Sequence, residues 1–305
     1  MYASHRRFGL NKSLATQNTF GSAVIQRLRD YWALSKPRVT LLVWITNLFG
    51  MLLAGAASPG PIAINLLGAW FVIAAANVLN QVIEAVPDSQ MSRTRNRPIP
   101  AGRVTPIEAT LLGIVWAVIG LLILALWVNP LTACLGAVSI GLYALAYTPL
   151  KRVTHLCTVV GAIPGAIPPL AGWAAVTGTL NPPAFLLFAI QFFWQFPHFW
   201  AIAWLLRQDY AKVGFKMLPY PDADGKSTAV CALKYSLPVL PLSLAYAFLL
   251  SKPWLYVPLA MLAGWWLLSA AIKFVNTPDD LAARRVLKAS IGYMPAVLLA
   301  MMICR

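Results

Sequence analysis

Residues 62–83 read IAINLLGAWFVIAAANVLNQVI, an apolar run without a charged side chain that is followed at once by Glu84. About 20 apolar residues in a helix cross the ~30 Å hydrocarbon core of a bilayer. Such runs recur along the chain, and we count nine, at residues 39–57, 62–83, 107–128, 131–149, 156–176, 184–206, 229–250, 254–275 and 286–304. In lipid each run must be helical, because a helix satisfies its own backbone hydrogen bonds. The sequence predicts an all-α, polytopic membrane protein with nine transmembrane helices.

The composition and the distribution of charge agree with this class. Of the 305 residues, 59% are hydrophobic and 11% are charged, whereas a soluble protein carries about a quarter charged residues. Of the 24 Lys and Arg residues, only Lys252 and Arg305 fall on the side opposite to the N-terminal segment and the loops after the even-numbered runs. The positive-inside rule then predicts a cytoplasmic N-terminus and an external C-terminus. The net charge of +15 thus reflects topology, and we expect no nucleic-acid partner.

The chain divides into two parts by composition. Residues 1–36 are polar and basic and lack the apolar core of a secretory signal, so we expect a basic cytoplasmic tail. Residues 37–305 are expected to form a single transmembrane domain in the cell inner membrane. The four cysteines are scattered through apolar segments without metal-ligand spacing, which is typical of packing residues.

Polar residues gather where the second run ends. Asn80, Glu84 and Asp88 are spaced i, i+4 and i+8, which places them on one face of a helix, one turn apart. Oxygen ligands of this kind suit Mg²⁺, which binds few protein carboxylates and completes its shell with water and phosphate oxygens. Arg93 and Arg97 follow, and guanidinium groups match phosphate oxygens. The cluster predicts a Mg²⁺-diphosphate site, although an ion-paired helix cap that anchors the topology would use the same residues.

A second polar cluster follows the sixth run. Asp209 ends this run as Asp88 ends the second, and Lys212 and Lys216 come directly after it. A third basic turn, Lys151-Arg152, ends the fourth run. Three clusters at helix ends on the same side could together bind one diphosphate, and this repetition is harder to explain by topology anchors alone.

Two histidines have open interpretations. His198 lies inside the sixth run, about three helical turns before Asp209. Its imidazole could bind heme iron, or it could be a buried histidine that is hydrogen-bonded to a neighbouring helix. His155 falls in a turn and is interpreted as a solvated loop residue.

These motifs resemble those of the UbiA-type membrane prenyltransferases, and the resemblance covers roughly residues 30–303. The first acidic motif, from Asn80 to Arg97-Pro, is shared by the whole superfamily. Five further stretches are similar to the branch that farnesylates heme, the protoheme IX farnesyltransferases or heme O synthases. They are Tyr147-Thr-Pro-Leu-Lys-Arg, Gly161 to Pro169, Gly172-Trp-Ala-Ala-Val-Thr-Gly178, Pro197-His-Phe-Trp-Ala201, and Asp209-Tyr210 with Gly214 and Met217-Leu-Pro219.

The resemblance implies a nine-helix bundle that uses Mg²⁺ and transfers a farnesyl group from farnesyl diphosphate to a vinyl group of heme b, giving heme O. By position, Asn80, Glu84, Asp88 and Asp209 would be catalytic, with Glu84, Asp88 and Asp209 as the metal ligands. Arg93, Arg97, Lys151 and Arg152 would bind the diphosphate, and His198 would lie on the heme side. Heme A synthase and oxidase assembly proteins are possible partners.

One departure from the pattern of this branch concerns a carboxylate. Its members usually carry a further Asp between the positions of Glu84 and Asp88, where this chain has Val86 followed by Pro87. Pro87 removes a backbone donor and could bend Asp88 away from the acidic face. Three alternatives therefore stay open: a prenyltransferase with another aromatic acceptor, a family member that binds heme without turnover, and a small-molecule transporter.

Overall fold

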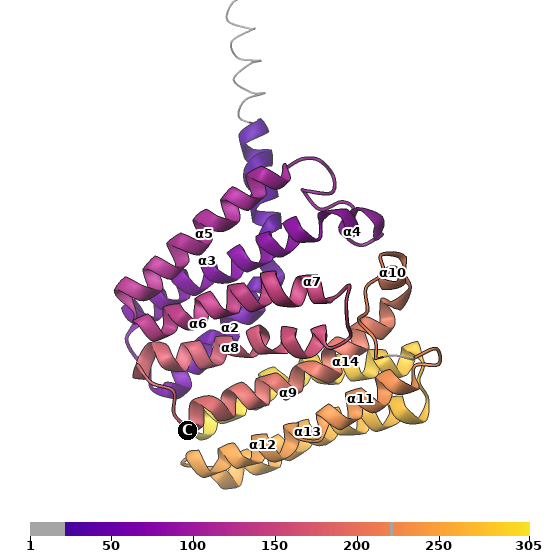
Figure 1. The fold of residues 1–305 in the computed structure, drawn as a ribbon. Coiled ribbons are helices and arrows are strands. Elements are labelled where there is room, and N and C mark those ends of the chain that lie inside the picture. Colours follow the sequence, from indigo (N-terminus) through magenta and orange to yellow (C-terminus); the bar gives the residue numbers. More distant parts are fainter. Residues whose placement is uncertain (1–21, 220–221) are drawn as a thin grey trace, which may run out of the picture.

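The structure, a computed structural model, describes residues 22–219 and 222–305, and every regular element in these ranges is a helix (Figure 1). Residues 22–34 are helical. The later elements are α2 (Pro37–Ala54), α3 (Pro59–Ile83), α4 (Ala85–Gln90), α5 (Pro106–Trp127), α6 (Pro130–Ile140), the π-helix η1 (Gly141–Tyr147), α7 (Thr148–Leu150), α8 (Cys157–Thr177), α9 (Pro182–Leu205), α10 (Arg207–Lys212), α11 (Lys226–Ser236), α12 (Val239–Ala245), the 3₁₀ helix η2 (Tyr246–Leu249), α13 (Pro253–Asn276) and α14 (Asp280–Cys304).

In the described ranges, nine helical stretches are long and apolar enough to cross a membrane. Two of them are composite: α6, η1 and α7 form one stretch, and α11, α12 and η2 form another. The predicted fold class is therefore confirmed, and the bounds agree closely because most stretches begin at a proline. Proline fits the first helical turn, where its missing N–H has no partner in any case.

The helices pack side by side in one bundle. The most extensive contacts are those between α3 and α5, between α2 and α8, and between α13 and α14. Helix α9 contacts α8, α11 and α14. A Cβ atom on Gly172 of α8 would lie 2.0 Å from the Asn47 carbonyl oxygen of α2. Glycine is therefore required where α2 and α8 cross, as is usual at close helix contacts in membranes.

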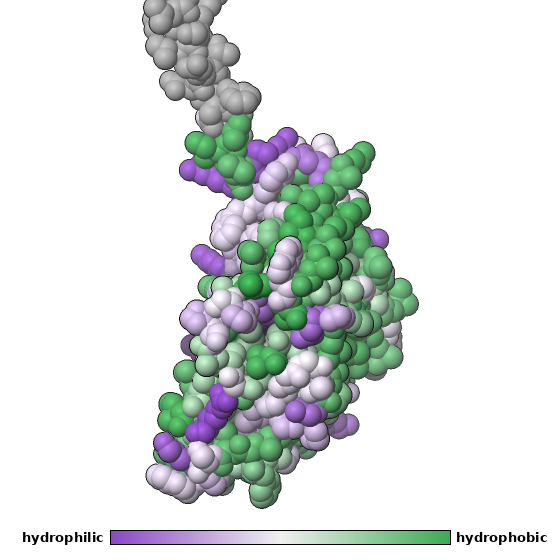
Figure 2. Space-filling view, turned by 90° about the vertical axis from the view of Figure 1, so that its left-hand side faces the viewer, coloured by the Kyte–Doolittle hydropathy of each residue, from purple (hydrophilic) through white to green (hydrophobic). Residues whose placement is uncertain are grey.

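The two ends of the bundle differ in character. The loop end carries α4, residues 91–105, residues 151–156 and α10, and Figure 1 shows α4 and α10 on the same side of the molecule. Figure 2 looks onto the side with the short loops and shows apolar surface interrupted by separate hydrophilic spots. Trp127, Phe248 and Trp254 are exposed near these short loops, where aromatic side chains suit the interface between lipid and water. The chain is a multi-pass membrane protein, and its orientation remains a prediction.

The described part of the predicted tail packs against the loop end. Tyr31 donates a hydrogen bond to Glu108 at 2.5 Å, and Arg103 forms an ion pair with Asp30 at 2.9 Å. Residues 22–34 are thus held beside the start of α5. Residues 1–21 of that tail lie outside the described residues, and the division at residues 36 and 37 stays a prediction.

Candidate active site

The acidic residues predicted at the end of the second span lie on both sides of a break between two helices. Helix α3 ends at Ile83 and α4 begins at Ala85, with Glu84 between them at φ −92° and ψ 10°. The Glu84 N–H donates to the Asn80 carbonyl at 3.0 Å, and the Asp88 N–H donates to the Glu84 carbonyl at 2.8 Å. Pro87 lies in the first turn of α4, where a missing N–H is tolerated. The two backbone hydrogen bonds that join Asn80, Glu84 and Asp88 are thus kept across the break.

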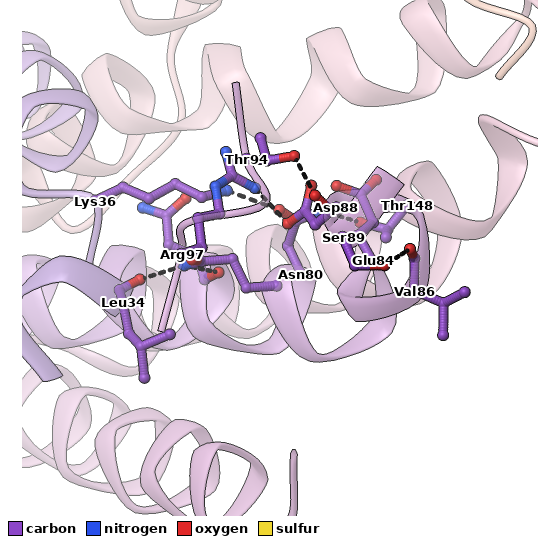
Figure 3. A network of polar contacts seen from close by, with 12 residues as sticks. Leu34, Lys36, Asn80, Glu84, Val86, Asp88, Ser89, Thr94, Arg97 and Thr148 are labelled. Carbon is purple, nitrogen blue, oxygen red and sulfur yellow. Dashed lines mark hydrogen bonds and ion pairs between the residues drawn. The ribbon is translucent and has the colours of Figure 1, made fainter. Parts of the chain in front are cut away.

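Asn80 joins three helices through its side-chain amide. Its Oδ1 accepts a hydrogen bond from Lys36 Nζ at 2.7 Å, and its Nδ2 donates to Thr148 Oγ1 at 3.0 Å (Figure 3). Thr148 in turn donates to the Tyr143 carbonyl at 2.7 Å. Burial lowers the pKa of Lys36 to about 7, and the nearby charge of Arg97 adds to this effect. Asn80 is thus held between the start of α2 and the end of the fourth span.

Glu84 and Lys151 form a buried ion pair. Lys151 Nζ lies 2.7 Å from Glu84 Oε1, and the two side chains are only 11% and 7% exposed. The ammonium group also lies 4.5 Å from the centre of the Tyr147 ring. Burial opposes the charge on Lys151, but the Glu84 carboxylate, together with Tyr143 and Tyr210, raises the pKa of Lys151 above its ordinary value. This favours the protonated, cationic form of Lys151 at the acidic face.

Asp88 has one partnered and one free carboxylate oxygen. Arg97 Nη1 lies 2.5 Å from Asp88 Oδ2, and Thr94 Oγ1 donates to the Asp88 carbonyl at 2.8 Å (Figure 3). Asp88 is only 1% exposed, and its Oδ1 has no hydrogen-bond partner within the described residues. A buried carboxylate oxygen without a partner is costly. This atom is therefore a ready acceptor for a bound cation or donor.

An irregular helical segment of the fourth span comes directly before Thr148 and Lys151. Residues Gly141–Tyr147 form a π-helix, in which each turn holds more residues than in an α-helix. One added residue rotates the following side chains by about 100° around the axis, given 3.6 residues per α-helical turn. The π-helix therefore sets the face of the span from which Thr148 and Lys151 reach α3.

The second acidic site has a matching construction. Helix α9 ends at Leu205, Leu206 breaks the helix at φ −104° and ψ 12°, and Asp209 lies in the six-residue helix α10. Hydrogen bonds from Lys212 (3.1 Å) and Ser92 (3.0 Å) hold the pKa of Asp209 below its ordinary value. Ser92 follows α4, so it links the two acidic segments directly.

The third basic turn is joined to this second site. The Lys216 N–H donates to the Lys151 carbonyl at 2.6 Å, and the Phe215 ring lies 5.8 Å from Lys151 Nζ. The structure thus brings the three clusters together at the loop end. Arg93 and Arg152 are exposed there, as is His155, and the catalytic and binding roles of all these residues remain predictions.

His198 is placed between α9 and α14. Its Nδ1 lies 3.0 Å from Ser290 Oγ, and its ring stacks on Trp194 at 5.4 Å between centres. Trp194 Nε1 donates to the Ser290 carbonyl at 2.7 Å. These contacts match the interpretation of His198 as a packed, hydrogen-bonded histidine, and its heme role stays a prediction.

Sequence reasoning missed several residues of this site. It counted Lys36 only as a topology charge, and it gave no role to Ser92 or Thr148. Lys36 has no local signal for this place, because a following proline favours extended backbone and not the left-handed conformation found here. The other two depend on contacts between distant segments, 117 residues apart for Ser92 and Asp209.

The donor atoms at the acidic face fit a magnesium ion. Asn80, Glu84 and Asp88 offer only oxygen ligands, and the free Oδ1 of Asp88 is buried. Within residues 22–219 and 222–305, no three His, Cys, Asp or Glu side chains are close enough to hold a metal by themselves. A Mg²⁺ ion here would take one or two carboxylates, and water and phosphate oxygens would complete its shell.

Comparison with known proteins identifies the family. The UbiA prenyltransferase family matches residues 43–292. The chain belongs to this family. Its relatives include a protoheme IX farnesyltransferase of Gloeobacter violaceus, which is 40% identical over 278 residues, covering 90% of this chain and 91% of the relative.

Solved structures of UbiA-type proteins share the fold. A digeranylgeranylglyceryl phosphate synthase has a TM-score of 0.77 at 19% identity, and the match covers 92% of this chain and 98% of the synthase. A UbiA homolog from Archaeoglobus fulgidus bound to GPP and Mg²⁺ has a TM-score of 0.60 at 15% identity, covering 89% and 99% of the two chains. The UbiA family predicted from the motifs is confirmed, and so is its nine-span fold within the described residues.

Proposed function

We propose that this UbiA-family protein transfers a farnesyl group from farnesyl diphosphate to a vinyl group of heme b, giving heme O and diphosphate. The observation that carries the proposal is the joining of Glu84–Lys151, Asp88–Arg97 and Asp209–Lys212 at one end of a membrane bundle. Paired acids and cations at one place suit a Mg²⁺-diphosphate, whose charges need both signs nearby. The protoheme IX farnesyltransferase name of relatives at about 40% identity supports the choice of substrates.

The proposed chemistry begins at the diphosphate. The C1–O bond of farnesyl diphosphate breaks, and the electron pair leaves with the diphosphate. Arg97 and Lys151 would stabilise the negative charge that develops on the diphosphate. Electrostatic stabilisation of this kind is the largest single contribution to the rate enhancement in many enzymes. Mg²⁺, held by one or two of the carboxylates of Glu84, Asp88 and Asp209 and by water, would act as a Lewis acid toward the diphosphate oxygens.

The acceptor then completes the reaction. The heme vinyl group attacks the farnesyl cation to form a C–C bond, and a water molecule adds to the remaining cation and loses a proton. The sum is farnesyl diphosphate, heme b and water giving heme O and diphosphate. The apolar spans would keep bulk water from the farnesyl cation until the C–C bond forms. We further propose that His198 lies on the heme side, that Asn80, Arg93 and Arg152 contact the diphosphate, and that the protein resides in the cell inner membrane with the loop end cytoplasmic.

The test uses purified protein with farnesyl diphosphate, heme b and Mg²⁺, and it measures both diphosphate release and the heme product. Asp88→Ala is expected to abolish both, because it removes the carboxylate that Arg97 and the cation would share. Asp280→Ala is the matched control, since Asp280 also pairs with an arginine (Arg207, 2.8 Å) but is 52% exposed. The control is expected to stay within about twofold of the parent, as exposed ion pairs contribute little. Near-normal heme O formation by a folded Asp88→Ala variant would contradict the assigned role.

A further inference from the structure

Lys36 has an unusual backbone conformation at the entrance to α2. Its φ is 50° and its ψ is 62°, and it is the single non-glycine residue with positive φ among the described residues. Side chains other than glycine rarely adopt this left-handed region, and they keep it only where the surroundings enforce it. An outlier of this kind suggests that the position of the side chain matters.

Hydrogen bonds from α3 hold the backbone just before Lys36. Gln81 Nε2 donates to the Leu34 carbonyl at 2.6 Å, and Asn77 Nδ2 donates to the Ser35 carbonyl at 3.2 Å. Thr40 of α2 also donates to the Ser35 carbonyl, at 2.6 Å. Because Asn77 and Gln81 lie one turn apart on α3, one face of that helix fixes the turn that carries Lys36.

The adjacent face of α3 receives the side chain. Lys36 Nζ donates to Asn80 Oδ1 at 2.7 Å, and Figure 3 shows it reaching across to the acidic face on the same side as Arg97. An ammonium group has three N–H donors, and the bond to Asn80 uses one of them. Asn80 is otherwise occupied by Thr148, so Lys36 lies where α2, α3 and the fourth span meet.

We propose that Lys36 is a further diphosphate-binding residue, contributed by the N-cap of α2 and placed by Asn77 and Gln81 on the same side of the acidic face as Arg97. This inference rests on the proposed function. The cations of the acidic face otherwise come from the loop after α4 and from the end of the fourth span. Lys36 would add N–H donors from a third segment, the entrance to α2, so that the diphosphate would be contacted from three segments between the two helix ends.

A role in binding can be separated from a role in folding because of the left-handed backbone. Lys36→Gly removes the ammonium group and places at this position the residue that tolerates positive φ best. Its thermal midpoint should equal or exceed that of the parent, while its binding of diphosphate is weakened. Lys36→Met removes the charge and keeps a long side chain, and Lys36→Arg keeps a cation.

The experiment measures, by calorimetry, the Kd with which the protein binds inorganic diphosphate in the presence of Mg²⁺. It also measures the KM values for farnesyl diphosphate and heme b. We expect Lys36→Met and Lys36→Gly to raise the diphosphate Kd and the farnesyl diphosphate KM at least tenfold and to leave the heme KM within twofold. Lys36→Arg should stay within threefold. The control Arg38→Gln removes an exposed cation two residues away and should stay within twofold.

Two other outcomes overturn the inference in distinguishable ways. If the parent binds diphosphate and forms heme O but both Lys36→Met and Lys36→Gly bind diphosphate within twofold of the parent, the role of Lys36 is refuted and the proposed function stands. If the parent itself neither binds Mg²⁺-diphosphate nor turns over, the proposed function is refuted and the inference falls with it.

Discussion

The buried pair of Lys151 and Glu84 offers a test that separates a catalytic site from a topology anchor. The two charged groups are 2.7 Å apart, and their side chains are 11% and 7% exposed. Removing one partner of a buried pair leaves the other charge uncompensated, which costs about 3–5 kcal/mol, whereas replacing both is often close to neutral. We therefore expect Lys151→Met and Glu84→Gln to lower the free energy of unfolding by about 3 kcal/mol each.

The double variant should recover most of that loss. A double-mutant cycle isolates the coupling between the two side chains, and contacting residues in one network show couplings of about 0.5–3 kcal/mol. We expect a larger value here, about 5 kcal/mol, because two single losses of about 3 kcal/mol each would leave only about 1 kcal/mol in the double variant. The cycle is measured by denaturant titration in detergent micelles. The Lys151 ammonium group also contacts the Tyr147 ring, so a part of the single-variant loss would remain.

Turnover of the same three variants decides between the two interpretations. If the pair binds Mg²⁺-diphosphate, heme O formation should be lost in the double variant although its stability is restored. If the pair only caps helices, the stable double variant should turn over normally, and that result would refute the assigned roles. Single variants that cost under about 1 kcal/mol, the range of exposed pairs, would refute the reasoning from burial.

Three further predictions follow from other parts of the structure. Gly172→Ala should destabilise the fold by about 1–3 kcal/mol because its Cβ would meet the Asn47 carbonyl at 2.0 Å; Gly60→Ala, with open space around it, should be near neutral in the same denaturant titration. His198→Ala should raise the heme KM at least tenfold and leave diphosphate binding unchanged, and an unchanged heme KM would leave His198 as a packing residue. Val86→Asp should change turnover less than threefold, because Val86 is 67% exposed and points away from the acidic face (Figure 3); a large gain would show that the missing carboxylate limits activity.

The spans were predictable because a membrane-crossing helix requires a long apolar run, which is visible in the sequence without knowledge of the fold. Apolar length, proline starts such as Pro106 and Pro130, and charged loops are all local features of the sequence, and lipid allows one backbone solution for each run. The acidic face was predictable for the same reason, since Asn80 to Asp88 repeats at the helical period. These features require no knowledge of which segments meet.

The rest of the site depends on contacts between distant segments. Lys151 reaches Glu84 across 67 residues, and Lys36 reaches Asn80 across 44. The π-helix before Thr148 sets which face of the fourth span is used, and its sequence carries no strong local signal for that geometry. The left-handed turn at Lys36 is enforced by Gln81 and its neighbours on α3, so it too is a property of the folded bundle.

The most direct test of the proposed activity is a heme extraction. The protein would be expressed in a host that lacks its own heme O synthase, and the extracted hemes would be resolved by chromatography and mass spectrometry. The proposal predicts a new heme that is heavier than heme b by one farnesyl group and one water molecule. Heme b alone, from membranes shown to contain the folded protein, would contradict it and would favour a member that binds heme without turnover or one that prenylates another acceptor.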